Sequence, residues 1–389
     1  MKTDEDAKMI SISASLKPLI ITIAACSSLY LTFLGLLTIR YLQDHVIYLH
    51  RVTLTWFQDV NVPEQWGFLR NQVTPFYLIT PDGETLHTWH ILPLETYRRN
   101  EKALRDEPTG LCQDIKERLA FKLLRDNPSS QLVIYLHGAA GTLGSGWRPQ
   151  SYRAISAAAQ NVHILAIDYR GFGSSTGWPS EAGLLTDALT LADFAMKMAG
   201  IRPERIVVFG QSLGTGVSIA LAHHLAIQVP PILFAGMVLV APFANVELLT
   251  QTYNKLAALI RHCETTLKVG QRRHNKYDVT LIHAEDDYDI PWVHSEIVVW
   301  HAVNAMREPN NSLSFDGLEE IKAKEKLEFG AGGWEMDWRG KGGVVREQIV
   351  KHGLHDRIMS YPIVSLAVAR AFHSQDTSYE VAEGPDRGL

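Results

Sequence analysis

The sequence is poor in cysteine and has no strong excess of charge of either sign. Its 389 residues include only Cys26, Cys112 and Cys263. Three widely spaced cysteines exclude a disulfide-dense scaffold and a cysteine-rich zinc site. Cys112 and Cys263 either pair in an oxidising compartment or remain free thiols. The formal net charge of -5 gives no indication of a nucleic-acid partner.

The chain also lacks the motifs that hold nucleotides and catalytic metals. The glycine-rich stretch at 137–146 has no Gly-Lys-Ser/Thr ending, which a phosphate loop uses to hold phosphates and magnesium. In a second stretch, Gly171 and Gly173 are followed by Gly177, one residue too late for the dinucleotide-binding fingerprint. No His-Glu-x-x-His pattern is present. We therefore expect no nucleotide, no metal and no other cofactor.

One long hydrophobic run stands near the N-terminus. Residues 19–39 carry no charge and are bracketed by Lys17 and Arg40. At about 1.5 Å per residue, a helix of this length crosses the roughly 30 Å hydrocarbon core of a bilayer. The alternative is a cleaved signal peptide, whose apolar region is shorter, about 7–15 residues. We expect an N-terminal tail at 1–17, an uncleaved transmembrane helix at 18–40 and a membrane-proximal segment at 41–74.

Charges around this run bear on its orientation. Three lysines precede it, whereas Arg40 and Arg51 are the basic residues that soon follow. Because basic residues collect on the cytosolic side, this difference favours a cytosolic N-terminus and a lumenal remainder. The glycosylation sequon Asn310-Asn311-Ser312 fits the same orientation. We expect a single-pass protein of the endoplasmic reticulum or another endomembrane.

From residue 75 the pattern becomes that of an α/β domain. Two strand-like segments flank Pro81-Asp82-Gly83 and predict a hairpin with its turn. Further strands are predicted at 131–137, 161–169, 205–210, 235–243, 278–285 and 344–350. Helices are predicted near 150–160, 181–199, 213–227, 292–305 and 357–373. Unbroken apolar runs separated by helices indicate strands covered on both faces, hence a mostly parallel, doubly wound sheet.

The predicted domain spans residues 75–375 and is followed by a C-terminal tail at 376–389. Its charged segment at 97–128 is expected to form a surface loop or helix. The segment at 244–276 is longer than a simple crossover requires and is expected to form a lid over a pocket. The glycine-rich and charged segment at 309–343 is expected to be a loop insertion.

A serine between two glycines marks the end of one predicted strand. Gly210-Gln211-Ser212-Leu213-Gly214 comes directly after an apolar strand and opens a helix. This context is that of a nucleophile elbow, in which a strained turn exposes the serine hydroxyl. Small flanking residues let the strand and the helix approach each other. Ser212 is therefore the candidate nucleophile.

A serine nucleophile needs a base, and the base needs an acidic residue to orient it. In this fold the order along the chain is Ser, Asp or Glu, His. The end of the strand at 278–285 and the residues after it offer the acidic candidates Glu285, Asp286, Asp287 and Asp289. The residues after the last strand offer two histidines, His352 and His355. Both groups follow strands, where the active site of an open α/β sheet lies.

The oxyanion that forms during acyl transfer also needs hydrogen-bond donors. The backbone N–H of Leu213 and an N–H of the loop His137-Gly138-Ala139 are expected to converge on it. Because losing one such donor typically costs on the order of 10²–10³ in rate, the loop is expected to be rigid.

Four motifs together resemble one family: "DYRGFGSSTGWPSEAGLLTDA", "FGQSLGTGVSIALA", "LVAPFANV" and "LIHAEDDYDIP". The chain is similar to the single-span membrane α/β hydrolases that include monoacylglycerol and lysophosphatidylserine lipases (α/β-hydrolase domain-containing protein twelve). The resemblance covers about 75–375 and the N-terminal span. It implies an α/β-hydrolase fold with Ser212 as nucleophile, Asp287 as acid and His355 as base. The family's His-Gly-Asn oxyanion loop corresponds to a loop that contributes Ala139.

We therefore expect a membrane-anchored serine hydrolase that cleaves acyl esters of lipids, either monoacylglycerol or lysophospholipid, at the bilayer. A protein depalmitoylating thioesterase with a cytosolic site and a serine peptidase are the enzymatic alternatives. A non-catalytic binding module on the same fold is the third alternative, although such modules usually lose a member of the triad.

Overall fold

The computed structural model describes residues 4–243, 251–266 and 277–373 and divides the chain into two compact units. The first unit, Met1–Leu49, contains helices α1 (Asp4–Leu36) and α2 (Arg40–Tyr48). The part of α1 from Lys17 to Leu36 is long and apolar enough to cross a membrane. It corresponds to the helix predicted at 18–40 and ends somewhat earlier, since a short turn separates Leu36 from α2.

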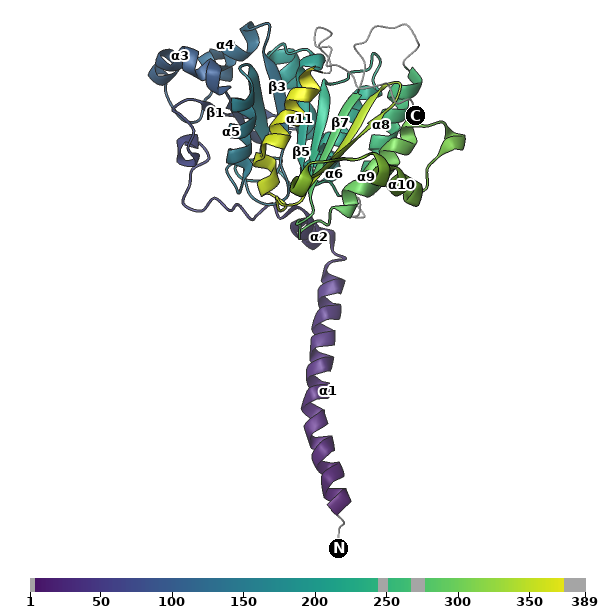
Figure 1. Ribbon diagram of the computed structural model, residues 1–389. Helices are drawn as coiled ribbons and strands as arrows, with labels where there is room; N and C mark the ends of the chain where they lie inside the picture. Colours follow the sequence, from purple (N-terminus) through teal and green to yellow (C-terminus); the bar gives the residue numbers. More distant parts are fainter. Residues whose placement is uncertain (1–3, 244–250, 267–276, 374–389) are drawn as a thin grey trace. The chain divides into compact units, whose positions relative to one another are not determined.

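The second unit, His50–Leu389, is built around a mixed sheet (Figure 1). In its described part the sheet has the order β1-β2-β4-β3-β5-β6-β7-β10-β9-β8. The six central strands, β4, β3, β5, β6, β7 and β10 in sheet order, are parallel to one another. The pair β1 and β2 extends the sheet antiparallel beside β4, and β9 and β8 extend it antiparallel beside β10. The strands are β1 (Val73–Ile79), β2 (Thr85–Ile91), β3 (Gln131–Leu136), β4 (Val162–Ile167), β5 (Ile206–Gln211), β6 (Gly236–Val240), β7 (Tyr277–Ala284), β8 (Leu327–Glu328), β9 (Gly333–Arg339) and β10 (Gly343–Val350).

Helices cover both faces of this sheet, as the strand–helix alternation predicts. The α-helices in the described part of this unit are α3 (Leu94–Asp106), α4 (Leu119–Asp126), α5 (Arg148–Ala158), α6 (Glu181–Asp193), α7 (Leu213–Ala226), α8 (Gln251–Thr266), α9 (Val293–Met306), α10 (Phe315–Glu325) and α11 (Pro362–His373). Helices α5 and α11 pack on one face, and residues of α7 to α10 pack on the other (Figure 1). The mostly parallel sheet with helices on both faces, expected from the sequence, is confirmed.

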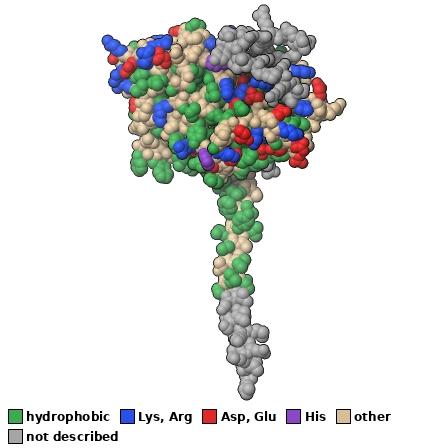
Figure 2. Space-filling model, viewed as in Figure 1, with side chains coloured by type: hydrophobic (Ala, Val, Ile, Leu, Met, Phe, Trp, Pro, Cys, Tyr) green, Lys and Arg blue, Asp and Glu red, His purple; other side chains and the backbone are tan. Residues whose placement is uncertain are grey.

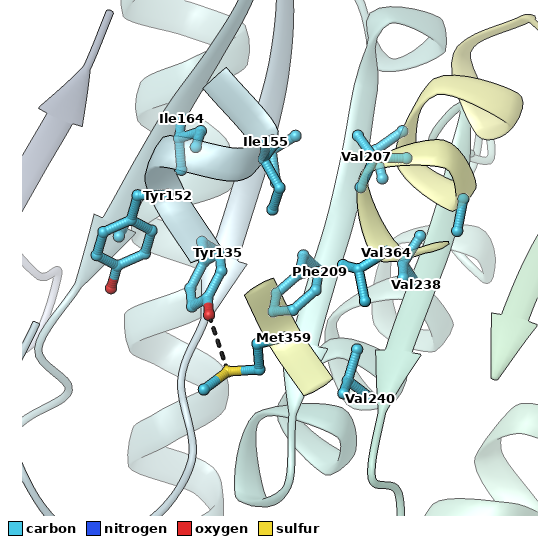
Figure 3. Close-up of a cluster of buried hydrophobic side chains, with 14 of the residues drawn as sticks. Tyr135, Tyr152, Ile155, Ile164, Val207, Phe209, Val238, Val240, Met359 and Val364 are labelled. Carbon is cyan, nitrogen blue, oxygen red and sulfur yellow. Dashed lines mark hydrogen bonds between the residues drawn. The ribbon is translucent and has the colours of Figure 1, made fainter. Parts of the chain in front are cut away.

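The two cores follow from the alternation of side chains along the central strands. In β6, Val238 and Val240 join the cluster under α5 and α11, whereas Met237 and Leu239 join the cluster on the opposite face. Every residue of β6 is thus buried. The first cluster also contains a group of aromatic rings, which Figure 3 shows between the sheet and α5. This double burial makes the strands unbroken apolar runs in the sequence.

Two expectations about local structure are wrong. The segment at 309–343 is not a loop, because it forms α10, the short edge strand β8 and the strand β9, which pairs antiparallel with both β8 and β10. The predicted helix at 357–373 is interrupted, since a short 3-10 turn at Arg357–Ser360 precedes α11. Pro362 explains the break, because proline lacks an N–H and disfavours helical geometry at the residue before it.

The described part of the expected lid, α8, packs into the core. Its side chains Leu256, Ile260 and Cys263 are buried in the cluster with α9. Residues 244–250 and 267–276, the rest of that expected segment, lie outside the described residues. Residues 50–74, expected to be membrane-proximal, fall in the second unit with the sheet. The cysteines at 26, 112 and 263 are free thiols.

Candidate active site

Ser212 occupies the sharp turn between β5 and α7. The strand ends at Gln211 and the helix begins at Leu213, so Ser212 alone makes the turn. Its φ of 50° and ψ of -119° are strained for a residue with a side chain. Its N–H donates to the carbonyl of Val240 over 3.0 Å, which holds the turn against β6. The sequence-predicted elbow is therefore present at the carboxyl end of the sheet.

The two glycines of the motif are required by close backbone contacts. A Cβ on Gly214 would lie 1.9 Å from the carbonyl oxygen of Leu136 in β3. A Cβ on Gly210 would lie 2.4 Å from the carbonyl oxygen of Gly214. Neither oxygen can move without displacing its strand or helix. The glycines thus let α7 start directly behind the serine.

An aspartate and a histidine meet in the loops that follow β7 and β10. Because these strands are parallel neighbours, both loops lie at the same edge of the sheet. The Nδ1 atom of His355 lies 2.8 Å from Oδ2 of Asp287. The other oxygen, Oδ1, accepts the N–H groups of Asp289 and Ile290 over 3.0 and 2.9 Å. The carboxylate is therefore fixed in position and faces the ring.

The electrostatics of this pair suit a base and its orienting acid. Burial by itself raises the pKa of Asp287, but hydrogen bonds from His283 and His355 outweigh it and hold the pKa below its usual range. Burial by itself lowers the pKa of His355, but the hydrogen bond and charge of Asp287 outweigh it and raise the pKa. The ring accepts a proton readily while the carboxylate stays ionised.

The other candidates of the sequence analysis pair elsewhere. Asp286 accepts from the ring of His352 at 3.2 Å, and the side chain of His352 is 85 % exposed. Glu285 forms an ion pair with Lys351 over 2.7 Å. The structure thus separates two acid–histidine pairs. The histidine of the pair Asp286–His352 is exposed, whereas the pair Asp287–His355 is largely buried.

Asp289 lies close enough to the buried pair to raise the question of a metal. Ligand atoms of Asp287, Asp289 and His355 lie within 4.8 Å of one another. The facing atoms of Asp287 and His355, however, are hydrogen-bonded to each other. That arrangement is the geometry of an aspartate orienting an imidazole.

Gln211 connects the elbow to the histidine loop. Its Nε2 donates to Oδ1 of Asp356, the neighbour of His355, over 3.1 Å. This contact places the two segments side by side. Among the described residues, the hydroxyl of Ser212 forms no hydrogen bond with His355. The contact between Gln211 and Asp356 is what brings the segments of Ser212 and His355 together.

The loop after β3 lies against the elbow. A Cβ on Gly138 would lie 2.3 Å from Oε1 of Gln211 and 3.2 Å from Cβ of Ser212. In the part of the chain that the structure describes, the backbone N–H groups of Ala139 and Leu213 have no acceptor. Two unpaired donors on the segments that flank the serine are what an oxyanion hole requires.

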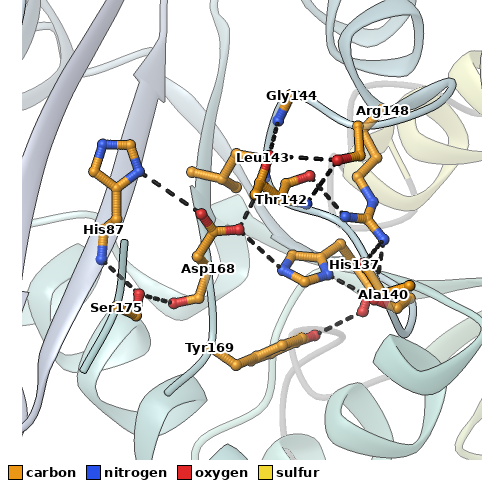
Figure 4. Close-up of polar contacts among 12 residues, drawn as sticks. His87, His137, Ala140, Thr142, Leu143, Gly144, Arg148, Asp168, Tyr169 and Ser175 are labelled. Carbon is orange, nitrogen blue, oxygen red and sulfur yellow. Dashed lines mark hydrogen bonds and ion pairs between the residues drawn. The ribbon is translucent and has the colours of Figure 1, made fainter. Parts of the chain in front are cut away.

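One buried arginine holds this loop in shape (Figure 4). The guanidinium of Arg148 donates to four carbonyls of the loop, over 2.6 to 3.1 Å: those of Gly138, Ala139, Ala140 and Thr142. The carbonyl of Gly138 and the N–H of Ala139 belong to one trans peptide and point in opposite directions. By binding that carbonyl, Arg148 directs the Ala139 N–H away from itself.

A buried aspartate supports the same loop from below (Figure 4). Asp168 accepts the N–H of Leu143 over 2.8 Å, and its oxygens lie 3.5 Å from His137 and 3.8 Å from His87. Burial by itself raises the pKa of Asp168, but its contacts with the two histidines outweigh it and lower the pKa. A charged carboxylate thus stays under the loop that carries the Ala139 donor.

Sequence reasoning missed three of these contributors. His283 and Gln211 lie inside the quoted motifs, yet nothing in their spacing shows which atoms they contact. Arg148 stands just before the helix predicted near 150–160, where an arginine side chain is normally exposed to solvent. Only the folded loop shows that its guanidinium is buried and surrounded by carbonyls.

An apolar cavity in the described residues lies elsewhere. Its lining includes Val208, Met237 and Val279, near the amino ends of the parallel strands. Ser212 follows the carboxyl end of β5. The cavity is therefore remote from the candidate active site and belongs to the packing between the sheet and α8.

Comparisons with known proteins find sequences that are similar to this chain. The sequence model of the family described as "Alpha/beta hydrolase family" matches residues 133–323. The chain is 28% identical over 267 residues to the Xenopus tropicalis lysophosphatidylserine lipase ABHD12, covering 64% of this chain and 63% of the relative. It is 30% identical over 207 residues to the Bos taurus protein of that name, covering 53% and 46%. It is 29% identical over 279 residues to the human protein ABHD12B, covering 68% and 70%.

The matched part thus spans less than two thirds of the ABHD12 lipase from Xenopus tropicalis. The resemblance stated from the sequence motifs is confirmed at this level: the chain is similar to these lipases. The matched region includes the elbow, and the fold is that of an α/β hydrolase.

Proposed function

We propose that this relative of the α/β-hydrolase lipases is a serine hydrolase that cleaves acyl esters of lipids. Ser212 is the nucleophile, His355 the general base and Asp287 the residue that orients the ring. The backbone N–H groups of Ala139 and Leu213 form the oxyanion hole. These roles rest on the geometry of the described residues.

In the first half-reaction, the hydroxyl oxygen of Ser212 attacks the ester carbonyl carbon and its proton passes to Nε2 of His355. The oxyanion accepts hydrogen bonds from the two backbone donors. Collapse breaks the bond to the alcohol, which leaves with the proton from His355. In the second, water attacks the acyl-enzyme, His355 takes its proton, and the fatty acid and free serine are released.

The single observation that carries the proposal is the 2.8 Å contact between His355 and Asp287 at the sheet edge that carries the strained serine. Gln211 joins the two segments directly, so the pair and the elbow belong to one site. A hydroxyl is a poor nucleophile at neutral pH, and this arrangement supplies the base that activates it.

Two observations support a lipid substrate. Relatives that match 64% and 53% of this chain carry the name lysophosphatidylserine lipase. The apolar part of α1 is long enough to span a bilayer, which would hold the catalytic unit near acyl esters that reside there. Monoacylglycerol and lysophospholipid are single-chain esters that such a unit would meet at the membrane surface.

The proposed setting is a single-pass protein of the endoplasmic reticulum or another endomembrane, with its catalytic unit in the lumen. The excess of lysines before the apolar run supports this orientation. Asn310 of the sequon is exposed, as a glycosylation site must be.

Turnover of defined substrates tests the proposal. Full-length protein is assayed with lysophosphatidylserine and monoacylglycerol, and with an acyl-thioester peptide and an unmodified peptide as controls. The wild type should release fatty acid from a lipid ester, and Ser212→Ala should lower that rate by about 10⁴-fold or more. Preferential cleavage of the thioester or the peptide would replace the substrate class, and an active Ser212→Ala variant would remove the nucleophile.

A further inference from the structure

A short segment at the start of the second unit exposes large apolar side chains. Leu54 is 56 % exposed, Trp56 74 % and Phe57 fully exposed. Exposed leucines are ordinary on protein surfaces, but a tryptophan and a phenylalanine side by side in water are not. Such a cluster indicates a surface that is covered in use.

This segment is attached to the loop that carries the oxyanion donor. The carbonyl of Val52 accepts the N–H of Gly141 over 2.5 Å. The carbonyl of Thr53 accepts from the hydroxyl of Ser145 over 2.6 Å. The same loop carries Ala139, so the segment that bears the exposed side chains is held against a loop of the candidate active site.

Three other exposed apolar side chains lie on the loops of the site. Trp147 follows the oxyanion loop and is stacked by Arg357, two residues beyond the catalytic histidine, at 5.6 Å. Tyr288 follows the catalytic aspartate, and Leu354 precedes the catalytic histidine. All three are exposed, Tyr288 almost completely. The loops that carry Asp287 and His355 therefore also expose apolar side chains to solvent.

We propose that Leu54, Trp56, Phe57, Trp147, Tyr288 and Leu354 form a docking surface that lies on a lipid bilayer and presents the active site to it. The inference rests on the proposed function in one respect, since the docked bilayer supplies the substrate. It adds a second membrane contact, separate from α1, made by the catalytic unit itself.

Two features of the chain identify the bilayer as the occupant. Residues 37–51 join the end of α1 to this segment and are at most about 50 Å long when fully extended. The surface therefore cannot leave the neighbourhood of a bilayer that α1 spans. Its composition is also suitable, because tryptophan and tyrosine prefer the membrane–water interface, where their rings lie among lipid headgroups.

Fluorescence quenching by lipid tests the surface without turnover. The nine tryptophans of the chain all lie after residue 50, so none belongs to α1. Full-length protein is reconstituted in phosphatidylcholine vesicles with and without brominated phosphatidylcholine. Bromolipid should quench the wild type, and Trp56→Phe should lose a measurable part of that quenching. Equal quenching in the two proteins would show that Trp56 does not enter the bilayer and would overturn the proposal.

Kinetics on two substrates tests the consequence for catalysis. The variant Leu54→Ser/Trp56→Ser/Phe57→Ser should raise KM for lysolipid in vesicles by about tenfold and leave hydrolysis of a soluble short-chain ester unchanged. The control Ile227→Ser/Val229→Ser alters two exposed apolar residues at the far end of α7 and should change neither. An unchanged KM in the triple variant would contradict the proposal, as would a wild-type dimer that the triple variant converts to monomers. Failure of the proposed function would remove turnover on both substrates but leave the quenching result intact.

Discussion

The carboxylate of Asp287 accepts a hydrogen bond from the ring of His283 over 3.0 Å, on the same oxygen that faces His355. His283 is completely buried in β7, and its other ring nitrogen lies 2.7 Å from the hydroxyl of Ser295. The aspartate is therefore held by a strand side chain as well as by its own loop. Its orientation is set by the sheet, which is more rigid than a loop.

The pH dependence of hydrolysis follows from the contact between Asp287 and His355. Only the neutral ring can accept the serine proton, and Asp287 raises the pKa of His355. The acid limb of kcat/KM on a soluble ester should therefore have its midpoint above the ordinary value for histidine. Asp287→Asn should move the midpoint to lower pH and reduce the plateau by about 10⁴-fold. A midpoint that does not move in this variant would separate the two residues.

The two neighbouring histidines should differ sharply when each is replaced. His355 contacts the buried aspartate, whereas His352 is exposed and contacts Asp286. His355→Ala should abolish lipid-ester turnover, and His352→Ala should retain nearly all of it. Initial rates for the two purified variants, compared at equal amounts of folded protein, check this. The opposite ranking would assign the base to position 352.

Arg148 should matter for the rate more than for substrate binding. Its guanidinium fixes four loop carbonyls, including the one that sets the direction of the Ala139 N–H. Arg148→Ala should lower kcat by about 10²-fold with little change in KM, because loss of an oxyanion donor acts on the transition state. Arg148→Lys, which can still reach some carbonyls, should recover part of the rate. A folded Arg148→Ala protein with wild-type kcat would refute this role, with folding checked by thermal unfolding.

The proposed lumenal orientation predicts a sugar on Asn310. Full-length protein made in eukaryotic cells should shift in electrophoresis after treatment with peptide N-glycosidase, and Asn310→Gln should abolish the shift. Asn311→Gln is the matched control, because it leaves the Asn310-x-Ser312 sequon intact. A wild-type protein with no shift would argue against the lumenal placement and reopen the cytosolic thioesterase as an interpretation.

Much of the sheet could be predicted from the sequence because burial on both faces leaves a plain pattern. The runs that form β3, β5 and β6 contain almost no polar residue. The elbow was also recognisable, because Gly210 and Gly214 are demanded by backbone contacts and the serine between them follows a strand. The order Ser, Asp or Glu, His along the chain then leaves only a few candidates for the acid and for the base.

The remaining features depend on contacts that the local sequence does not encode. The strand β9, next to the two-residue edge strand β8, alternates buried and half-exposed residues, so the glycine and charge around it suggest a loop. The preference for Asp287 over Asp286 comes from the resemblance to the hydrolase family, because the two aspartates are neighbours and their spacing from the strand does not distinguish them. The role of Arg148 depends on the folded shape of the preceding loop, whose carbonyls surround its guanidinium.

All other proposed roles depend on Ser212 being the nucleophile. Full-length wild-type protein treated with a fluorophosphonate should carry the phosphonyl adduct on the peptide that contains Ser212, as located by tandem mass spectrometry, and Ser212→Ala should carry none. An adduct on a different serine, or unchanged labelling of Ser212→Ala, would contradict the assignment.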